Sequence, residues 1–187
     1  IDEARELLNK HEKASSKRKI IIKKKSGGDV RTDYDDAYIR DILNGAKLAA
    51  IPVNTPLVMY IDGESTGNPG HAGIGIVIFD KENRQIGKVS DYIGMRSDST
   101  AEYLAFIRAL KLALYFQASE LKVRTDSELI IRQFNGDYKT KSTDLKKYID
   151  EVKELSLKVK NFKLEQVSKN QNDKADFLAK KGSEKYK

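Results

Sequence analysis

The sequence predicts an α/β fold in which a five-stranded mixed sheet carries helices on both of its faces. Three strand-length apolar segments follow one another between residues 57 and 93, and short polar stretches separate them. Two further strand-like segments then alternate with segments of helical periodicity. Such alternation is typical of parallel strands joined by helices. We therefore expect an antiparallel meander of three strands, extended by two strands that run parallel to the first.

The strands of this sheet are predicted from short runs rich in β-branched and aromatic residues. They are expected at residues 57–62, 72–80, 85–93, 120–126 and 161–167. The first two flank a loop, Gly63–Gly70, that is dense in turn-forming residues, so they should form an antiparallel hairpin. Glycines in this loop leave backbone amides uncovered, where a large polyanion can approach closely.

The helices are predicted from apolar residues at spacings of three and four, with polar residues at their starts. They are expected at residues 101–117, 127–135, 143–159 and 172–183. Ser99 or Thr100 is the expected N-cap of the first helix, which is apolar nearly all round and should be largely buried. Thr143 or Asp144 should open the third helix, and Asn135-Gly136 should end the second.

Residues 1–55 are predicted to form a small, basic α/β extension, and residues 56–187 the larger domain. Helices are expected at about 1–17 and 33–47 of the extension, with a short strand between them and a linker at 49–56. The short strand is flanked by a cationic cluster, which consists of Lys17, Arg18, Lys19, Lys23, Lys24 and Lys25. Two interpretations of the cluster stay open. It is either a solvated edge strand whose lysines discourage aggregation or an arm that contacts phosphates.

Composition limits the chemistry that the chain can perform. It has no cysteine and two histidines, which excludes disulfides, thiol nucleophiles, cysteine-based zinc sites and histidine-rich metal sites. Any metal would be a hard cation held by oxygen, such as Mg²⁺, Mn²⁺ or Ca²⁺. The net charge of +7 suits a polyanionic partner. With no long apolar run and an acidic start, we expect no membrane partner and no secretory signal, and hence a cytoplasmic protein.

Four carboxylates share a placement that packing does not explain: Asp62, Glu102, Asp126 and Asp176. Two end predicted strands that are parallel neighbours, and two lie one turn into predicted helices. Ligand sites in open α/β sheets form at such strand ends, so the four should converge. Singly, each acid could cap a turn or favour a helix dipole. Together they repel, and divalent cations would relieve the repulsion. Two such ions about 4 Å apart would activate water and stabilise the leaving oxygen in phosphodiester cleavage.

Four segments, in order and spacing, match one known family: Y-I-D-G-E-S-T-G-N-P-G, S-T-A-E-Y-L-A, V-R-T-D-S-E and V-S-K-N-Q-N-D-K-A-D-F-L-A. Through them, residues Leu57–Gly182 resemble type 1 ribonuclease H, the endonuclease that cuts the RNA strand of RNA/DNA hybrids. The resemblance implies a ribonuclease H-like fold, an RNA/DNA hybrid as partner, and two Mg²⁺ ions as cofactor, with Mn²⁺ as an alternative. It also implies hydrolysis that leaves 5′-phosphate and 3′-hydroxyl ends. We expect a monomer.

Carried over by position, the family's catalytic, metal-binding acids fall on Asp62, Glu102, Asp126 and Asp176. The positions implied to contact substrate are Gly63, Ser65, Asn68, Asp98, Ser99, Ser127 and Lys169. Asp98 and Ser99 fall where the family contacts ribose 2′-hydroxyls, the group that distinguishes RNA from DNA.

The chain departs from the family's pattern at three places. The loop 168–171 has no histidine, and Lys169, which lies there, does not shuttle protons near pH 7 at its ordinary pKa. Asp98 stands where asparagine is common. The segment 135–143 is a short turn where some members insert a basic protrusion. We therefore hypothesise that the cationic cluster of the extension supplies substrate affinity. Deleting residues 1–50 should then weaken hybrid binding and flatten its salt dependence, and an unchanged salt slope would contradict the hypothesis.

Two other functions remain open from the sequence: a catalytically silent nucleic-acid-binding module, and a DNA-directed nuclease on the same fold. The presence of all four acids argues against the first, and Gly67-Asn68-Pro69-Gly70 favours hybrid cleavage over the second.

Overall fold

The computed structural model describes residues 21–23, 29–31 and 51–186, and the chain divides into two compact units, residues 1–40 and 41–187. In the first unit, strands β1 (Ile21–Lys23) and β2 (Asp29–Arg31) pair antiparallel. The two helices predicted in the extension lie outside the described residues, as does most of the cationic cluster. The predicted domain boundary at residues 55 and 56 stays a prediction.

The second unit contains a five-stranded mixed sheet, as predicted. Its strands are β3 (Pro56–Ser65), β4 (Gly70–Phe79), β5 (Gln85–Arg96), β6 (Glu120–Thr125) and β7 (Phe162–Gln166). They lie in the order β5-β4-β3-β6-β7. The pairs β3–β4 and β4–β5 are antiparallel, whereas β6 runs parallel to both β3 and β7. The antiparallel meander with two added parallel strands is therefore confirmed.

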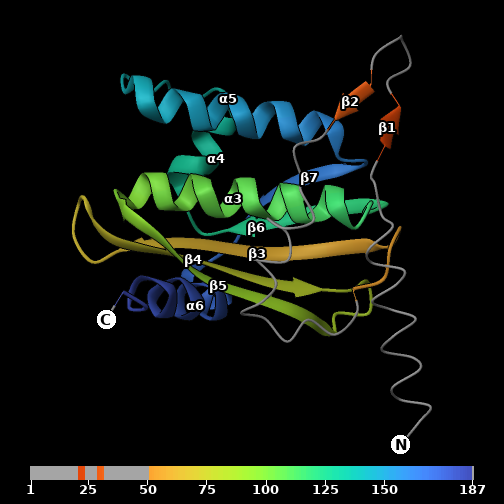
Figure 1. The fold of residues 1–187 in the computed structure, drawn as a ribbon, viewed down its shortest axis with the longest axis horizontal. Helices are drawn as coiled ribbons and strands as arrows, with labels where there is room; N and C mark the ends of the chain where they lie inside the picture. Colours follow the sequence, from red (N-terminus) through yellow and green to blue (C-terminus); the bar gives the residue numbers. More distant parts are fainter. Residues whose placement is uncertain (1–20, 24–28, 32–50, 187) are drawn as a thin grey trace, which may run out of the picture. The chain divides into compact units, whose positions relative to one another are not determined.

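Helices cover both faces of this sheet. They are α3 (Asp98–Tyr115), α4 (Glu128–Asn135), α5 (Thr143–Lys158) and α6 (Asp173–Ser183), and a 3₁₀ turn, η1 (Lys169–Gln171), precedes α6. Figure 1 shows α3, α4 and α5 on one side of the sheet and α6 alone on the other. Within the described residues, no helix is both long enough and apolar enough to cross a membrane.

The start of α3 differs from the prediction. Ser97, not Ser99 or Thr100, is the N-cap: its backbone is extended and its Oγ accepts a hydrogen bond from the Thr100 backbone N–H at 3.3 Å. Ser99 and Thr100 already lie within the helix. Serine and threonine are both favoured N-cap residues, so the sequence pattern alone does not distinguish Ser97 from Ser99 or Thr100. The predicted burial of this helix is confirmed, because Tyr103 and Phe106 are fully buried.

The first hairpin is longer than predicted. Gly63, Glu64 and Ser65, which were assigned to a loop, continue β3 and pair with Ile74, Gly73 and Ala72 of β4. The glycine and serine at these positions are typical of turns, so the sequence pattern predicted a loop where the strand continues. The true turn is short and contains a cis peptide bond between Asn68 and Pro69.

Candidate active site

The parallel pairing of β3 with β6 brings two of the predicted acids to the same level. Tyr60 pairs with Arg124 in this register, so two residues further along Asp62 stands beside Asp126. Asp62 still lies within β3, where it pairs with Gly75 of β4, and Asp126 follows directly on the end of β6. The convergence expected from strand order therefore occurs just beyond the last paired residues of two neighbouring parallel strands, Tyr60 of β3 and Arg124 of β6.

Gly63 allows the third acid to approach. A Cβ atom at this position would stand only 2.2 Å from the backbone N of Glu102 and the backbone C of Ala101. The first turn of α3 thus lies directly on β3, closer than any side chain would permit. Because Gly63 faces α3, its neighbours Asp62 and Glu64 face the opposite side of the sheet, toward α6.

Gly75 allows the fourth acid to approach in the same way. A Cβ atom there would stand 2.0 Å from the carbonyl oxygen of Ala175, so α6 lies against β4 at the residue that pairs with Asp62. Asp176 follows Ala175 in the first turn of α6. Two close backbone contacts, one on each face of the sheet, therefore deliver Glu102 and Asp176 to the strand that carries Asp62.

The pKa values of the acids show that they form one electrostatic cluster. Burial, together with the negative charges of Asp126, Asp176 and Glu102, raises the pKa of Asp62 from 3.8 to about 8, against a hydrogen bond from the Gly63 backbone. Burial and the charge of Asp126 together raise the pKa of Glu102 to about 7, although the hydrogen bond from Ser127 lowers it. Near neutral pH, part of this cluster holds protons unless cations replace them.

Asn172 is a member of the site that the sequence analysis missed as a functional residue. Its Nδ2 donates to Asp126 Oδ1 at 2.6 Å and to the Ile61 carbonyl oxygen at 3.0 Å, so it ties the end of β6 to β3. The side chain is buried, and among the described residues its Oδ1 has no hydrogen-bond partner. The available signal was its position four residues before Asp176, which places both on one face of a helical turn.

Glu64 is a second residue that the sequence analysis did not single out. Burial raises its pKa, and the charge of Asp176 raises it further, whereas Lys180 and Lys169 lower it. Its signal was the two-residue spacing from Asp62, which puts both carboxylates on one face of β3. The acidic cluster thus extends along this strand.

The donor chemistry of the cluster fits a hard divalent cation, since every donor is a carboxylate oxygen. As the side chains stand, no three histidine or acidic residues in the described part of the chain are arranged to hold a metal ion. Without a cation between them, the negative charges of these carboxylates repel one another and the side chains stay apart. Binding of a metal ion would therefore require the carboxylates to rotate toward it.

The residues predicted to contact substrate divide into two groups. Ser65, Asp98 and Ser127 are engaged within the protein. Ser65 Oγ donates to the Arg96 carbonyl oxygen at 2.9 Å, and the Ser65 backbone N–H donates to Asp98 Oδ1 at 2.7 Å. Ser127 Oγ donates to Glu102 Oε2 at 2.8 Å. Asp98 therefore fixes the β3–β4 hairpin to the start of α3. Ser127 also caps α4.

Three of the remaining predicted contacts lie in the β3–β4 turn, the start of α3 and η1. Asn68 is exposed in the hairpin turn, Ser99 lies in the first turn of α3, and Lys169 is exposed in η1. Gly63 is placed between β3 and α3, where it serves packing. The substrate-binding role of all seven residues stays a prediction.

Comparison with known proteins identifies what this arrangement resembles. The protein family described as "Reverse transcriptase-like" matches residues 60–182. Ribonuclease HI of Halobacterium salinarum is 33% identical over 120 residues, which are 64% of this chain and 60% of that protein. This chain therefore spans less than two thirds of the length of that curated relative.

Two solved structures share the fold. RNase H1 from the halophilic archaeon Halobacterium salinarum NRC-1 superposes with a TM-score of 0.66 at 31% identity, over 68% of this chain and 96% of that one. LC11-RNase H1, isolated from compost and solved in complex with an RNA/DNA hybrid, gives a TM-score of 0.64 at 36% identity, over 70% and 98% of the two chains. Both similarities cover the five-stranded sheet and its helices.

Proposed function

The chain belongs to the reverse transcriptase-like family and, within it, to the type 1 ribonucleases H, and from this premise we propose that it hydrolyses the RNA strand of RNA/DNA hybrids. One observation carries the proposal: in addition to burial, carboxylates from α3, α6 and the end of β6 raise the pKa of a single residue of β3, Asp62. A cluster that costs this much electrostatic free energy is typical of a catalytic site.

The family generally uses divalent metal ions, and Asp62, Glu102, Asp126 and Asp176 are the residues that would hold them here, with Mg²⁺ as the proposed ion and Mn²⁺ as an alternative. When bound, two such ions would supply an activated water and a stabilised 3′ leaving oxygen, so that cleavage would leave 5′-phosphate and 3′-hydroxyl ends.

Two side chains of this protein, Ser127 and Asn172, orient the acids for that role. Ser127 Oγ donates to Glu102 Oε2, which favours the ionised form of Glu102 and fixes its direction. Asn172 Nδ2 donates to Asp126 Oδ1, which fixes the direction of that carboxylate. Partners of this kind orient metal ligands in many proteins and strengthen metal affinity.

The hybrid is proposed to lie along the rim formed by the β3–β4 turn and the start of α3. Asn68 and Ser99 are the polar side chains there that could contact the RNA strand, including its 2′-hydroxyls. The Ser65–Asp98 hydrogen bond holds these two segments together, so their spacing is set before substrate arrives.

A direct assay tests the proposal. Labelled RNA/DNA hybrid and an all-DNA duplex of the same sequence are incubated with the full chain in Mg²⁺ or in EDTA. We expect cleavage of the RNA strand in Mg²⁺ alone. Cleavage of the DNA duplex would instead indicate a DNA-directed nuclease, and metal-independent binding without cleavage would indicate a silent binding module. Either result would refute the proposal.

A further inference from the structure

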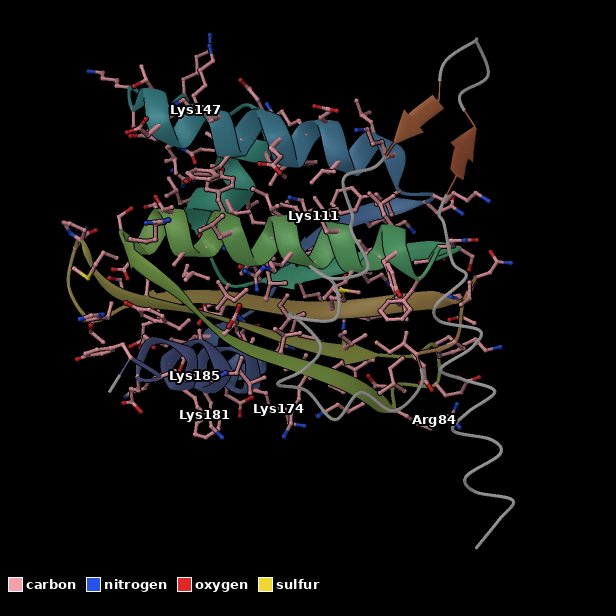
Figure 2. All side chains as sticks on the ribbon, in the orientation of Figure 1. Arg84, Lys111, Lys147, Lys174, Lys181 and Lys185 are labelled. Carbon is pink, nitrogen blue, oxygen red and sulfur yellow. The ribbon has the colours of Figure 1, made fainter. Side chains whose placement is uncertain are left out.

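The outer surface of α6 carries an aromatic and basic patch that the catalytic proposal does not use. We define the α6 patch as Lys88 of β5 together with Lys174, Phe177 and Lys181 of α6. The α6 residues are spaced by three and four, so they share one helix face. Figure 2 shows Lys174 and Lys181 projecting from α6 on the side away from the sheet.

A hollow lies within this patch. It has a volume of about 340 Å³, and its walls include Lys88, Lys174 and Phe177 beside Gln85 and Leu178. Phe177 is 63% exposed, although a phenylalanine ring normally gains free energy by burial. A single exposed apolar residue is common on protein surfaces. Phe177, however, lies beside a hollow lined by lysines, and this combination suits a ligand that has both an apolar ring and negative charge.

The lysines of the patch are available to such a ligand. Among the described residues, none of the three forms an ion pair with an acid. Lys174 Nζ lies 5.8 Å from the centroid of the Phe79 ring, a cation–π contact that holds its stem near the hollow. Of the described residues that line the hollow, two are lysines and one, Asp173, is an acid, so positive charge prevails.

We propose that the α6 patch binds single-stranded nucleic acid, with a base stacked on Phe177 and phosphates beside its lysines. Aromatic rings next to lysines are the usual means of holding single strands without sequence preference. A protein partner would use the ring equally well, but it would not explain three lysines that form no ion pair with any acid among the described residues. The proposal goes beyond hydrolysis of the hybrid, because it concerns binding that needs no metal ion.

The patch adjoins the carboxylate cluster around one helix. Asp176 and Phe177 are consecutive, so their side chains point about 100° apart around α6. A single strand that extends beyond the hybrid at the carboxylates would therefore meet Phe177 after crossing α6. We expect hybrids with a single-stranded overhang to bind more tightly than blunt hybrids of the same length.

The test measures binding of a fluorescent oligo-dT by anisotropy, with the full chain in EDTA so that nothing is cleaved. Phe177→Ala should weaken binding by about five-fold or more, the usual value of one stacked base, whereas Phe177→Tyr should retain it. Lys174→Gln with Lys181→Gln should reduce the slope of log affinity against log salt by about 1.4.

Matched controls come from α5. Leu157 is 87% exposed, so Leu157→Ala removes a comparable exposed apolar group, and Lys146→Gln with Lys153→Gln removes the same charge from exposed positions. The proposal is overturned if Phe177→Ala binds within about two-fold of the unmodified chain, or if the α5 lysine pair has as large an effect as the α6 pair.

Cleavage of a blunt hybrid in Mg²⁺ separates this proposal from the catalytic one. Phe177→Ala should cleave it normally while losing the preference for overhangs. Absence of cleavage by the unmodified chain would refute the proposed hydrolysis. The oligo-dT measurement would still test, independently, whether the α6 patch binds single-stranded nucleic acid.

Discussion

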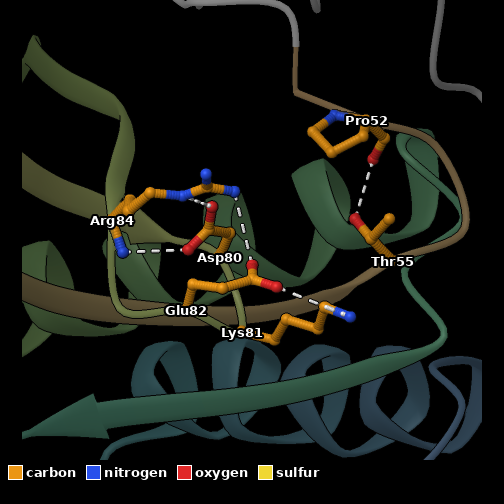
Figure 3. A network of polar contacts seen from close by, with 6 residues as sticks. All are labelled: Pro52, Thr55, Asp80, Lys81, Glu82 and Arg84. Atoms are coloured by element: carbon orange, nitrogen blue, oxygen red, sulfur yellow. Dashed lines mark hydrogen bonds and ion pairs between the residues drawn. The ribbon is translucent and has the colours of Figure 1, made fainter.

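Two aspartates, Asp62 within β3 and Asp80 directly after β4, show how the same side chain serves different purposes in this protein. Asp80 follows β4 and is 6% exposed. Its two carboxylate oxygens accept hydrogen bonds from the Arg84 backbone N–H at 2.9 Å and from Arg84 Nε at 2.7 Å, as Figure 3 shows. Burial alone would raise the pKa of Asp80, but these bonds outweigh it and the pKa lies below its ordinary value.

Asp62 has the opposite surroundings. Its neighbours Asp126, Asp176 and Glu102 carry the same charge, and its pKa lies near 8. Asp80 is therefore a structural acid whose hydrogen bonds to Arg84 close the turn between β4 and β5. Asp62 instead belongs to a cluster of acids whose mutual repulsion a bound cation would relieve. The comparison teaches that burial alone does not identify a functional acid; the sign of the charges around it does.

The largest expected effect comes from breaking the cluster. Asp126→Asn should reduce Mg²⁺-dependent cleavage of the hybrid by about 10³-fold or more, since metal ions contribute several kcal/mol to such reactions. Hybrid binding in EDTA should change little. Single-turnover cleavage and anisotropy measure the two quantities, and retained cleavage would show that Asp126 is no part of the active site.

Next in size is the effect of removing the support for Asp126. Asn172→Ala deletes the donor to Asp126 and to Ile61, so the Mg²⁺ concentration for half-maximal activity should rise by about 10- to 100-fold. Asn170→Ala provides the control, because Asn170 is exposed in the same loop. Equal Mg²⁺ titrations for the two variants would exclude a positioning role for Asn172.

The pH dependence of stability should then distinguish the two aspartates. The folded chain holds a proton on Asp62 up to a pKa of about 8, whereas the unfolded chain releases it near 3.8, so the unfolded state binds fewer protons between these values. In EDTA, the free energy of unfolding should therefore fall by a few kcal/mol as the pH rises through this window.

Urea unfolding at about pH 5 and about pH 8.5 measures this fall. Asp62→Asn should flatten it, and Mg²⁺ should reduce it because the ion binds the ionised cluster. A stability that rises with pH over the same range in EDTA would mean that Asp62 is not held protonated.

The smallest effect on activity is expected at Asp80. Asp80→Asn weakens the bonds to Arg84, so the urea midpoint should fall, while cleavage per folded molecule stays within about two-fold of the unmodified chain. A large loss of cleavage without loss of stability would show that Asp80 has a functional role and not a purely structural one.

The sequence by itself determined the order and type of the elements. Apolar runs and helical spacings predicted all five strands of the sheet and the four helices around it, because these patterns depend on neighbours close in the chain. It also supplied the four acids and excluded sulfur- and histidine-based chemistry. Strand order then predicted that Asp62 and Asp126 would meet, since neighbouring parallel strands share their carboxyl ends.

Only the tertiary structure decided how the site is held together. The Asn172–Ile61 contact joins residues 111 positions apart, and the Ser65–Asp98 and Ser127–Glu102 bonds join segments with no shared local pattern. These contacts depend on strand register and on how closely two backbones approach, as at Gly63 and Gly75. Local spacing in the chain carries no information about that approach, because it is set by the packing of α3 and α6 against opposite faces of the sheet.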